Sequence, residues 1–105
     1  MKRGEIWWVE LPLPTGRRPV LLLSRSEAYA VRELVTVAPV TTRIRRIPSE
    51  VNLGPEEDLP QRCVANLDTI TTIAKASLRE RLTTLSSDKL KEVEAAIHFA
   101  LGLET

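Results

Sequence analysis

Apolar and polar positions alternate in short runs along the first part of the chain, and this pattern predicts β-strands. The segment Gly4–Leu11 is rich in β-forming residues and carries apolar side chains at both odd and even positions. The segment Arg17–Arg25 contains the apolar run Val20–Leu23, which is typical of a buried strand, and Pro19 stands at its entry. The β-branched segment Leu34–Thr42 predicts a third strand. The first part of the chain is therefore predicted to be mainly β-structure.

The same pattern continues further along the chain, with turn-forming residues between the runs. Later strands are predicted at Ser49–Leu53, at Cys63–Ile73 with a bend near Asp68–Thr71, and at Arg79–Leu85. The connections are predicted at Pro12–Gly16, at the polar and possibly helical Ser26–Arg32, at the basic Arg43–Pro48 and at the acidic Gly54–Gln61.

The last part of the chain changes to helical spacing. Leu90, Val93, Ile97 and Leu101 form one apolar stripe. Ser86 is a suitable N-cap, Asp88 falls in the first turn, and Gly102 occupies the position of a C-terminal glycine. Phe99 lies on the opposite side of this helix, either as a lone exposed residue or as part of a second contact.

Many short strands followed by one helix predict an α+β fold. We expect a strongly curved antiparallel sheet or small barrel with the helix packed against it. The chain lacks the crossover helices that a parallel sheet needs. Its 105 residues, with 43% apolar and 28% charged side chains, predict one compact domain over residues 1–105.

Composition narrows the function classes. The single cysteine, Cys63, excludes an intramolecular disulfide and a cysteine-rich zinc site. The N-terminus has no apolar signal segment and no run is long enough to cross a membrane, so we expect a cytoplasmic protein with no membrane contact.

Positive charge is concentrated in one stretch, residues 17–46, although the net charge is only +1. Its seven basic residues are Arg17, Arg18, Arg25, Arg32, Arg43, Arg45 and Arg46, against two acids. Arginine binds phosphate bidentately and stacks on bases, so this stretch suits a nucleic acid. An arginine-rich solvated surface explains the composition equally well.

Several common chemistries find no support in the sequence. The only histidine, His98, lies on the predicted helix, so a two-histidine ribonuclease mechanism and a Ser–His–Asp triad are disfavoured. Cys63 lies in an apolar strand, where packing is a more common role than nucleophilic attack. The acids Glu56–Asp58 are adjacent on a proline-bounded loop, which favours a solvated tip over a metal site. Arginine, threonine and serine chemistry remains, and it suits RNA because RNA supplies its own 2′-hydroxyl nucleophile.

Four motifs, in order, resemble the MazF/PemK-type toxins. They are GEIWWVELPLPTG followed by RRPVLLLSR, then VTVAPVTT, then CVANLDTITTI, and finally RERL with TTLS and a helix ending in ALGL. The resemblance covers essentially the whole chain. It implies an SH3-like barrel, a homodimer, and cleavage of single-stranded RNA at short sequences without a metal or other cofactor. It also implies 2′,3′-cyclic phosphate and 5′-hydroxyl products, and a MazE-like antitoxin whose tail covers the RNA groove.

The resemblance also implies roles for individual residues. The catalytic arginine before proline corresponds to Arg18, and the catalytic threonine of the P-V-T end corresponds to Thr41. Our hypothesis is that Arg18 stabilises the phosphorane charge while Thr41 positions the phosphate or the 2′-hydroxyl. The remaining residues expected to bind RNA are Thr15, Gly16, Arg17, Ser24, Thr42, Arg43, Arg45, Arg46, Asn66, Asp68 and Thr69.

The sequence departs from the family pattern in two places. Thr69 replaces the usual amide after Asp68, so a different base preference is expected. The first loop, Pro12–Gly16, is short and has no acid, which leaves the general base unassigned; Glu10 is the nearest acid. The same barrel also occurs in CcdB-like toxins that inhibit gyrase by protein binding, and an inactive RNA- or antitoxin-binding relative is a third alternative. The pair Trp7–Trp8 is predicted to pack in the barrel, with a dimer or antitoxin surface as the alternative.

Overall fold

The strands and helices follow the predicted order with a few changes. The computed structural model describes residues 1–103. Its elements are β1 (Glu5–Glu10), β2 (Arg17–Leu22), α1 (Ala28–Val31), β3 (Leu34–Thr41), β4 (Glu50–Leu53), η1 (Pro55–Glu57), β5 (Cys63–Asn66), η2 (Leu67–Thr69), β6 (Thr71–Ala74), η3 (Lys75–Ser77), β7 (Leu78–Thr84) and α2 (Ser87–Ala100).

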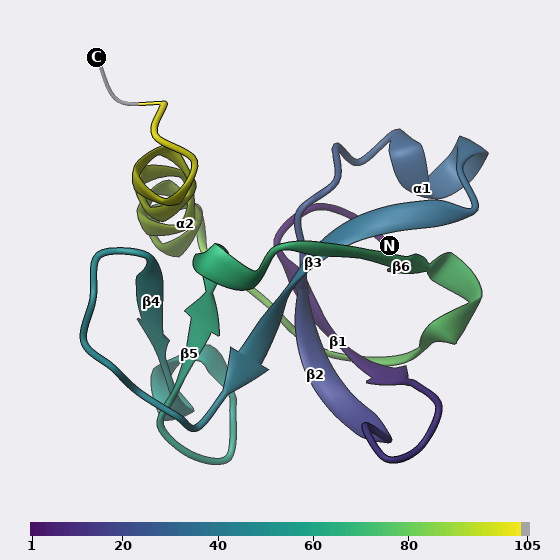
Figure 1. Cartoon of the computed structure of the whole chain (residues 1–105), viewed down its shortest axis with the longest axis horizontal. Coiled ribbons are helices and arrows are strands. Elements are labelled where there is room, and N and C mark those ends of the chain that lie inside the picture. Colours follow the sequence, from purple (N-terminus) through teal and green to yellow (C-terminus); the bar gives the residue numbers. More distant parts are fainter. Residues whose placement is uncertain (104–105) are drawn as a thin grey trace.

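The strands form one curled antiparallel sheet in the order β4-β5-β3-β2-β1-β7, with β6 paired to β3 off this path. Figure 1 shows the sheet curling into an open half-barrel, with α2 lying over the end that carries β4 and β5. The predicted α+β class, with a curved antiparallel sheet and a C-terminal helix, is therefore confirmed.

Strand β3 is the centre of the sheet because it changes partners along its length. Its first half, Leu34–Val37, pairs with β6, and Val37–Pro39 pair with β2. Its last two residues, Val40 and Thr41, pair with β5 instead. The start of β2, Arg17–Pro19, is therefore paired with β1 but not with β3. The sheet opens at this point, between the start of β2 and the end of β3.

Side chains alternate between two core clusters on the two faces of the sheet. One cluster contains Ile6 and Leu21 and is covered by Val93 of α2. The other contains Val9 and Leu22 with residues of β3 and β7. This alternation explains why Gly4–Leu11 carries apolar residues at both odd and even positions, since both faces of β1 are buried.

Helix α2 begins and ends where its capping residues predict. The Ser86 hydroxyl oxygen accepts a hydrogen bond from the Lys89 N–H at 3.1 Å, and Gly102 has a φ of +67°. The predicted stripe is wrong at its last position. Leu101 is 58% exposed, because the helix ends there and Ala96 and Ala100 pack against the sheet instead. Phe99 is exposed, as its position off the stripe predicts.

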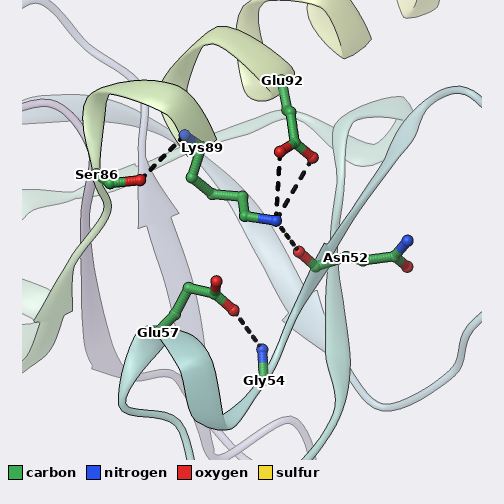
Figure 2. A network of polar contacts seen from close by, with 6 residues as sticks. All are labelled: Asn52, Gly54, Glu57, Ser86, Lys89 and Glu92. Carbon is green, nitrogen blue, oxygen red and sulfur yellow. Dashed lines mark hydrogen bonds and ion pairs between the residues drawn. The ribbon is translucent and has the colours of Figure 1, made fainter.

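A small polar network holds α2 against β4 (Figure 2). The Lys89 ammonium donates to the Asn52 carbonyl oxygen at 3.0 Å and pairs with Glu92 at 3.4 Å. Nearby, a Glu57 carboxylate oxygen accepts the Gly54 N–H at 2.7 Å, which fixes the start of η1. The acidic loop is thus partly used for local capping.

The predicted long strand Cys63–Ile73 is broken into two. The Asn66 side-chain oxygen accepts the Asp68 N–H at 2.9 Å, and this local bond starts the turn η2. Strand β5 pairs with the end of β3, while β6 pairs with its beginning. The break therefore allows one segment to serve both halves of β3.

The beginning and end of the fold are in close contact. A Cβ atom at Gly4, which has a φ of +94°, would lie 2.9 Å from the Leu90 side chain of α2. The Leu85 N–H donates to the Gly4 carbonyl oxygen at 2.9 Å, and Arg3 pairs with Glu94 at 3.2 Å. Position 4 therefore requires glycine both for its backbone angle and for its space.

Candidate functional site

Two hollows meet where the sheet opens between β2 and β3. The first, of about 420 Å³, lies on the face of the Val9 cluster, and the second, of about 450 Å³, lies mainly on the opposite face. The residues that line both are Arg18, Pro19, Val40 and Thr41. The two residues that the family resemblance marks as catalytic therefore stand together at the junction of the two hollows.

Arg18 is positioned by the start of β2, which is paired with β1 but not with β3. Its side chain is exposed, and among residues 1–103 the one hydrogen bond that its guanidinium makes is to the neighbouring Arg17 carbonyl oxygen at 3.4 Å. Within residues 1–103, no carboxylate lies within ion-pair distance of it. The guanidinium is therefore available to an anionic ligand.

Thr41 is half-buried at the end of β3. Its hydroxyl oxygen accepts a hydrogen bond from the Arg43 N–H at 3.1 Å. This bond occupies an acceptor position of the oxygen and leaves the hydroxyl proton to be donated elsewhere. The arrangement prepares Thr41 to donate a hydrogen bond to a ligand beside Arg18.

A half-buried carboxylate shapes the basic connection after β3. Glu50 accepts the N–H groups of Arg45 and Arg46 on one oxygen, at 2.9 and 3.1 Å. Its other oxygen is buried and has no hydrogen-bond partner within the described part of the chain. Arg46 takes a φ of +59°, which turns the connection sharply. As a result Arg43 and Arg45 reach the first hollow, while Arg46 lines neither hollow.

The first loop contributes to both hollows. Thr15 lines the first, and Arg17 lines the second. The Arg17 guanidinium lies over the Trp8 ring, 4.7 Å from its centroid, and pairs with Glu80 at 3.2 Å. Gly16 lines neither hollow, but its carbonyl oxygen accepts the Leu11 N–H at 3.0 Å and closes the loop.

The predicted base-reading residues lie around η2. Asn66 and Thr69 line the first hollow, and the Asn66 side-chain oxygen is already bonded to the Asp68 N–H. Asp68 is exposed beside this hollow, and one of its carboxylate oxygens accepts a 2.5 Å hydrogen bond from the buried Ser49 hydroxyl. Ser49 therefore fixes the direction of the Asp68 carboxylate.

The last two predicted RNA-binding residues differ in position, since one lines the second hollow and the other lines neither hollow. Thr42 is exposed and lines the second hollow. Ser24 lines neither hollow, and its hydroxyl oxygen accepts the Thr36 N–H at 2.8 Å. The structure thus gives Ser24 a role inside the fold, bridging the strand end to β3.

The acids of the described chain lie outside both hollows. Neither hollow is lined by an aspartate or glutamate of residues 1–103, and Glu10 is exposed beyond them. Cys63 lines the second hollow but is buried, and burial together with the nearby Glu57 raises the pKa of its thiol. His98 is exposed on α2 and lines neither hollow. The hollows therefore offer positive charge and hydroxyl groups.

Residues 1–103 hold neither a cluster of metal-binding side chains nor a helix of membrane length. In this part of the chain, no three histidine, cysteine, aspartate or glutamate side chains gather as a metal ion would require. Across the same residues, none of the helices has the length and apolar character that crossing a membrane demands.

The sequence analysis did not identify several residues that form the wall of the second hollow or hold other side chains in place. Trp8 is half-buried and lines the second hollow, whereas Trp7 packs against the Val9 cluster and donates to Glu5 at 2.9 Å. Gln61 also lines the second hollow. Ser49 and Glu50 follow the basic connection directly, and that position between arginines and a strand was the available signal.

Comparison with known proteins supports the resemblance. Residues 2–101 match the model of a family described as PemK-like, MazF-like toxin of type II toxin–antitoxin system. The probable endoribonuclease MazF5 of Mycobacterium tuberculosis is 40% identical over 94% of this chain and 91% of its own length.

Solved structures agree in fold. The Mycobacterium tuberculosis toxin MazF-mt6 superposes with a TM-score of 0.88 at 30% identity, covering 96% of this chain and 99% of that one. An endoribonuclease in complex with its cognate antitoxin, from a mycobacterial species, gives a TM-score of 0.86 at 28% identity, over 100% and 98% of the two chains.

Proposed function

The chain belongs to the family of PemK-like, MazF-like toxins of type II toxin–antitoxin systems, and from this premise we propose that it cleaves single-stranded RNA where Arg18 and Thr41 face the opening between β2 and β3. It is an endoribonuclease toxin, and the proposal concerns how and where it cuts. The observation that carries the proposal is the meeting of an unpaired guanidinium and an oriented hydroxyl at the junction of two acid-free hollows.

In the proposed reaction, the ribose 2′-oxygen forms a bond to phosphorus while the bond from phosphorus to the 5′-oxygen breaks. The 2′-hydroxyl proton is lost to solvent, and the departing 5′-oxygen takes up a proton. The products carry a 2′,3′-cyclic phosphate and a 5′-hydroxyl. Since the substrate supplies the nucleophile, the protein's main task is to stabilise the charge that builds up on the phosphorane.

Arg18 and Thr41 divide this task. An arginine side chain stays protonated in proteins, so Arg18 serves as a fixed positive charge on the phosphorane oxygens. Thr41 donates its hydroxyl proton to a phosphate oxygen or the 2′-oxygen, because the Arg43 N–H already occupies an acceptor position. Removing one such fixed donor from a site of this kind lowers the rate by about 10²–10³-fold.

The RNA chain crosses the junction of the hollows. Arg43 and Arg45 contact the phosphates without reading sequence, whereas Asn66, Asp68 and Thr69 offer the amide, carboxylate and hydroxyl groups that read base edges. Thr15 and Arg17 line the path from the first loop. Gly16, Ser24 and Arg46 line neither hollow and stay predictions as RNA contacts.

The proposed partners follow from the family. We propose that the toxin is a homodimer and that the tail of a cognate antitoxin covers the two hollows, which excludes RNA. A cytoplasmic location and a single domain over residues 1–105 stay predictions. No feature of the hollows favours the gyrase-inhibiting or inactive alternatives over cleavage.

The test is cleavage of a long single-stranded RNA in excess EDTA, with the 5′ ends mapped. The wild type should give discrete cuts with 5′-hydroxyl ends, and Arg18→Ala and Thr41→Val should each cut about 10²–10³-fold more slowly while still binding RNA. Arg25→Ala and Thr84→Val are matched controls, since both residues are exposed and line neither hollow. Equal rates for Arg18→Ala and Arg25→Ala would refute the assigned role, and activity only after a divalent metal is added would refute metal independence.

A further inference from the structure

The second hollow lies beside the proposed reaction centre and differs from the first in chemistry. Apolar side chains form most of its wall, and the β4–β5 connection supplies the remainder through Leu59, Pro60 and Gln61. Its volume, about 450 Å³, falls in the range of about 300–1,000 Å³ typical of ligand pockets. It shares Arg18 and Thr41 with the first hollow. A group held there must therefore be attached to, or lie next to, the phosphate at the junction.

Part of the wall of this hollow is a surface on which a base can stack. Trp8 and Arg17 lie in contact, with the guanidinium 4.7 Å from the ring centroid. Glu80 also pairs with the Arg17 guanidinium, at 3.2 Å. Flat aromatic and guanidinium groups are the surfaces on which single-stranded bases stack. The surface is already assembled without RNA, so binding a base there needs no reordering.

The β4–β5 connection adds an amide to the wall of this hollow. Gln61 is exposed, and its side chain makes no hydrogen bond to residues 1–103. The connection that carries it is fixed, because Glu57 caps the Gly54 N–H and the Leu59 N–H donates to the Gly54 carbonyl oxygen at 3.2 Å (Figure 2). An amide offers both a donor and an acceptor, as base edges require.

We propose that the second hollow is a nucleobase subsite for the nucleotide next to the scissile phosphate, with Trp8 and Arg17 stacking the base and Gln61 reading its edge. The inference rests on the proposed function and adds a specificity site that Asn66, Asp68 and Thr69 do not provide. An RNA base fits better than a peptide side chain, because a stacking surface and a free amide line the same hollow, which also contains Arg18 and Thr41.

The neighbouring tryptophans allow a direct test of stacking. Trp7→Phe leaves Trp8 as the only tryptophan, and Trp8→Phe leaves Trp7, which lines neither hollow. Each variant is titrated with a short RNA that carries a 2′-deoxyribose at the mapped cut site and therefore cannot be cleaved. Binding is followed separately by the anisotropy of a dye on the RNA.

The expected result is saturable quenching of Trp8 emission in Trp7→Phe, with the same midpoint as the anisotropy, and little change in Trp8→Phe. RNA that binds by anisotropy but leaves Trp8 emission unchanged would overturn the subsite and leave the proposed function standing. Quenching by an antitoxin peptide alone, and not by RNA, would likewise overturn it. No binding and no cleavage of any RNA would remove the proposed function and the subsite together.

A change of the amide tests the reading of the base. Gln61→Glu converts a donor and acceptor into an acceptor-only group, so cleavage of a randomised RNA library should shift at one position next to the cut toward the bases with an amino donor, adenine, cytosine and guanine, and away from uracil. Asn52→Asp is the matched control, since Asn52 lines neither hollow and its side chain points away from the Lys89 network (Figure 2). An unchanged preference at every position in Gln61→Glu would overturn the role of Gln61.

Discussion

Several single residues owe their chemistry to hydrogen bonds that neighbouring residues already make to them. Thr41 is prepared as a donor because Arg43 occupies its oxygen, and Asp68 is held by Ser49. The same principle acts in the fold at Glu5, a buried carboxylate on β1. Its position decides how the protein responds to acid.

Glu5 should make stability fall at low pH. Burial raises the pKa of Glu5, but the hydrogen bonds from Trp7 and Lys2 and the charges of the N-terminus and Arg81 together bring that pKa below its ordinary value. A carboxyl with a lowered pKa in the folded state stabilises above its unfolded pKa and loses this contribution as pH falls through the folded value. The free energy of unfolding should therefore decline below about pH 4.5.

Glu5→Gln checks this with urea titrations between pH 3 and pH 7. The variant should be less stable at pH 7 by about 1–3 kcal/mol, because hydrogen bonds to a charged carboxylate are replaced by weaker ones to a neutral amide. Its stability should also change less with pH than that of the wild type. Glu10→Gln, on the same strand but exposed, is the control and should follow the wild type. Parallel pH curves for wild type and Glu5→Gln would contradict the assignment.

Cys63 should react slowly with thiol reagents in the folded protein. Burial and then the nearby Glu57 raise the pKa of its thiol, and the thiolate is the reactive form. At pH 7.5 we expect labelling by iodoacetamide at least about tenfold slower than in the protein unfolded by urea. Equal labelling rates in the folded and unfolded states would show that the thiol is accessible and ionised.

At the scale of elements, the connection from β3 to β4 depends on one carboxylate. Glu50 accepts the N–H groups of Arg45 and Arg46, and this fixes the turn that brings Arg43 and Arg45 to the first hollow. Glu50→Ala should lower the free energy of unfolding by about 1–3 kcal/mol, since two backbone donors lose a charged acceptor. It should also raise the KM for RNA more than it lowers kcat.

Single-turnover cleavage at several enzyme concentrations separates these effects. Glu92→Ala, an exposed acid on α2, is the control for loss of one negative charge. Tighter RNA binding in Glu50→Ala, as in any variant that merely removes a negative charge, would show that Glu50 does not organise the connection.

The elements also show how far sequence reasoning reaches. Strand and helix positions followed from alternation and from capping residues such as Ser86 and Gly102, because these signals are local. The sequence predicts only a bend within Cys63–Ile73. The break itself depends on the hydrogen bond that the Asn66 side-chain oxygen accepts from the Asp68 N–H, and on the pairing of β5 and β6 with opposite ends of β3. Leu101 was assigned to the core because the stripe alone does not show where the helix ends.

At the scale of the whole molecule, the site forms where the start of β2 and the end of β3 are not paired with each other. Arg18 and Thr41 could be named from the sequence only through the family resemblance, since each looks like an ordinary strand residue. The second hollow could not be foreseen, because Gln61 lies far along the chain from Trp8 and Arg17 and joins them only in the curled sheet. Family membership then decides between cleavage and the gyrase-directed alternative.

Salt should weaken RNA binding in proportion to the phosphate contacts. Each phosphate contact on a single strand contributes about 0.7 to the slope of log affinity against log salt concentration. Arg43→Ala should therefore lower this slope by about 0.7, measured by anisotropy with the uncleavable RNA. Arg25→Ala, which removes a distant exposed charge, should leave the slope unchanged. An unchanged slope in Arg43→Ala would exclude Arg43 as a phosphate contact.

The pairing of β1 with β7 and the contact of Leu90 with Gly4 also affect when the toxin can finish folding during its synthesis. Strand β1 leaves the ribosome early. It can pair with β7, and Gly4 before it can contact α2, only after β7 and α2 have emerged. Because such distant contacts close late, the nascent chain is not fully assembled while it is being made. The opening that holds Arg18 and Thr41 is therefore supported by the complete sheet only once the last elements of the described chain have been made.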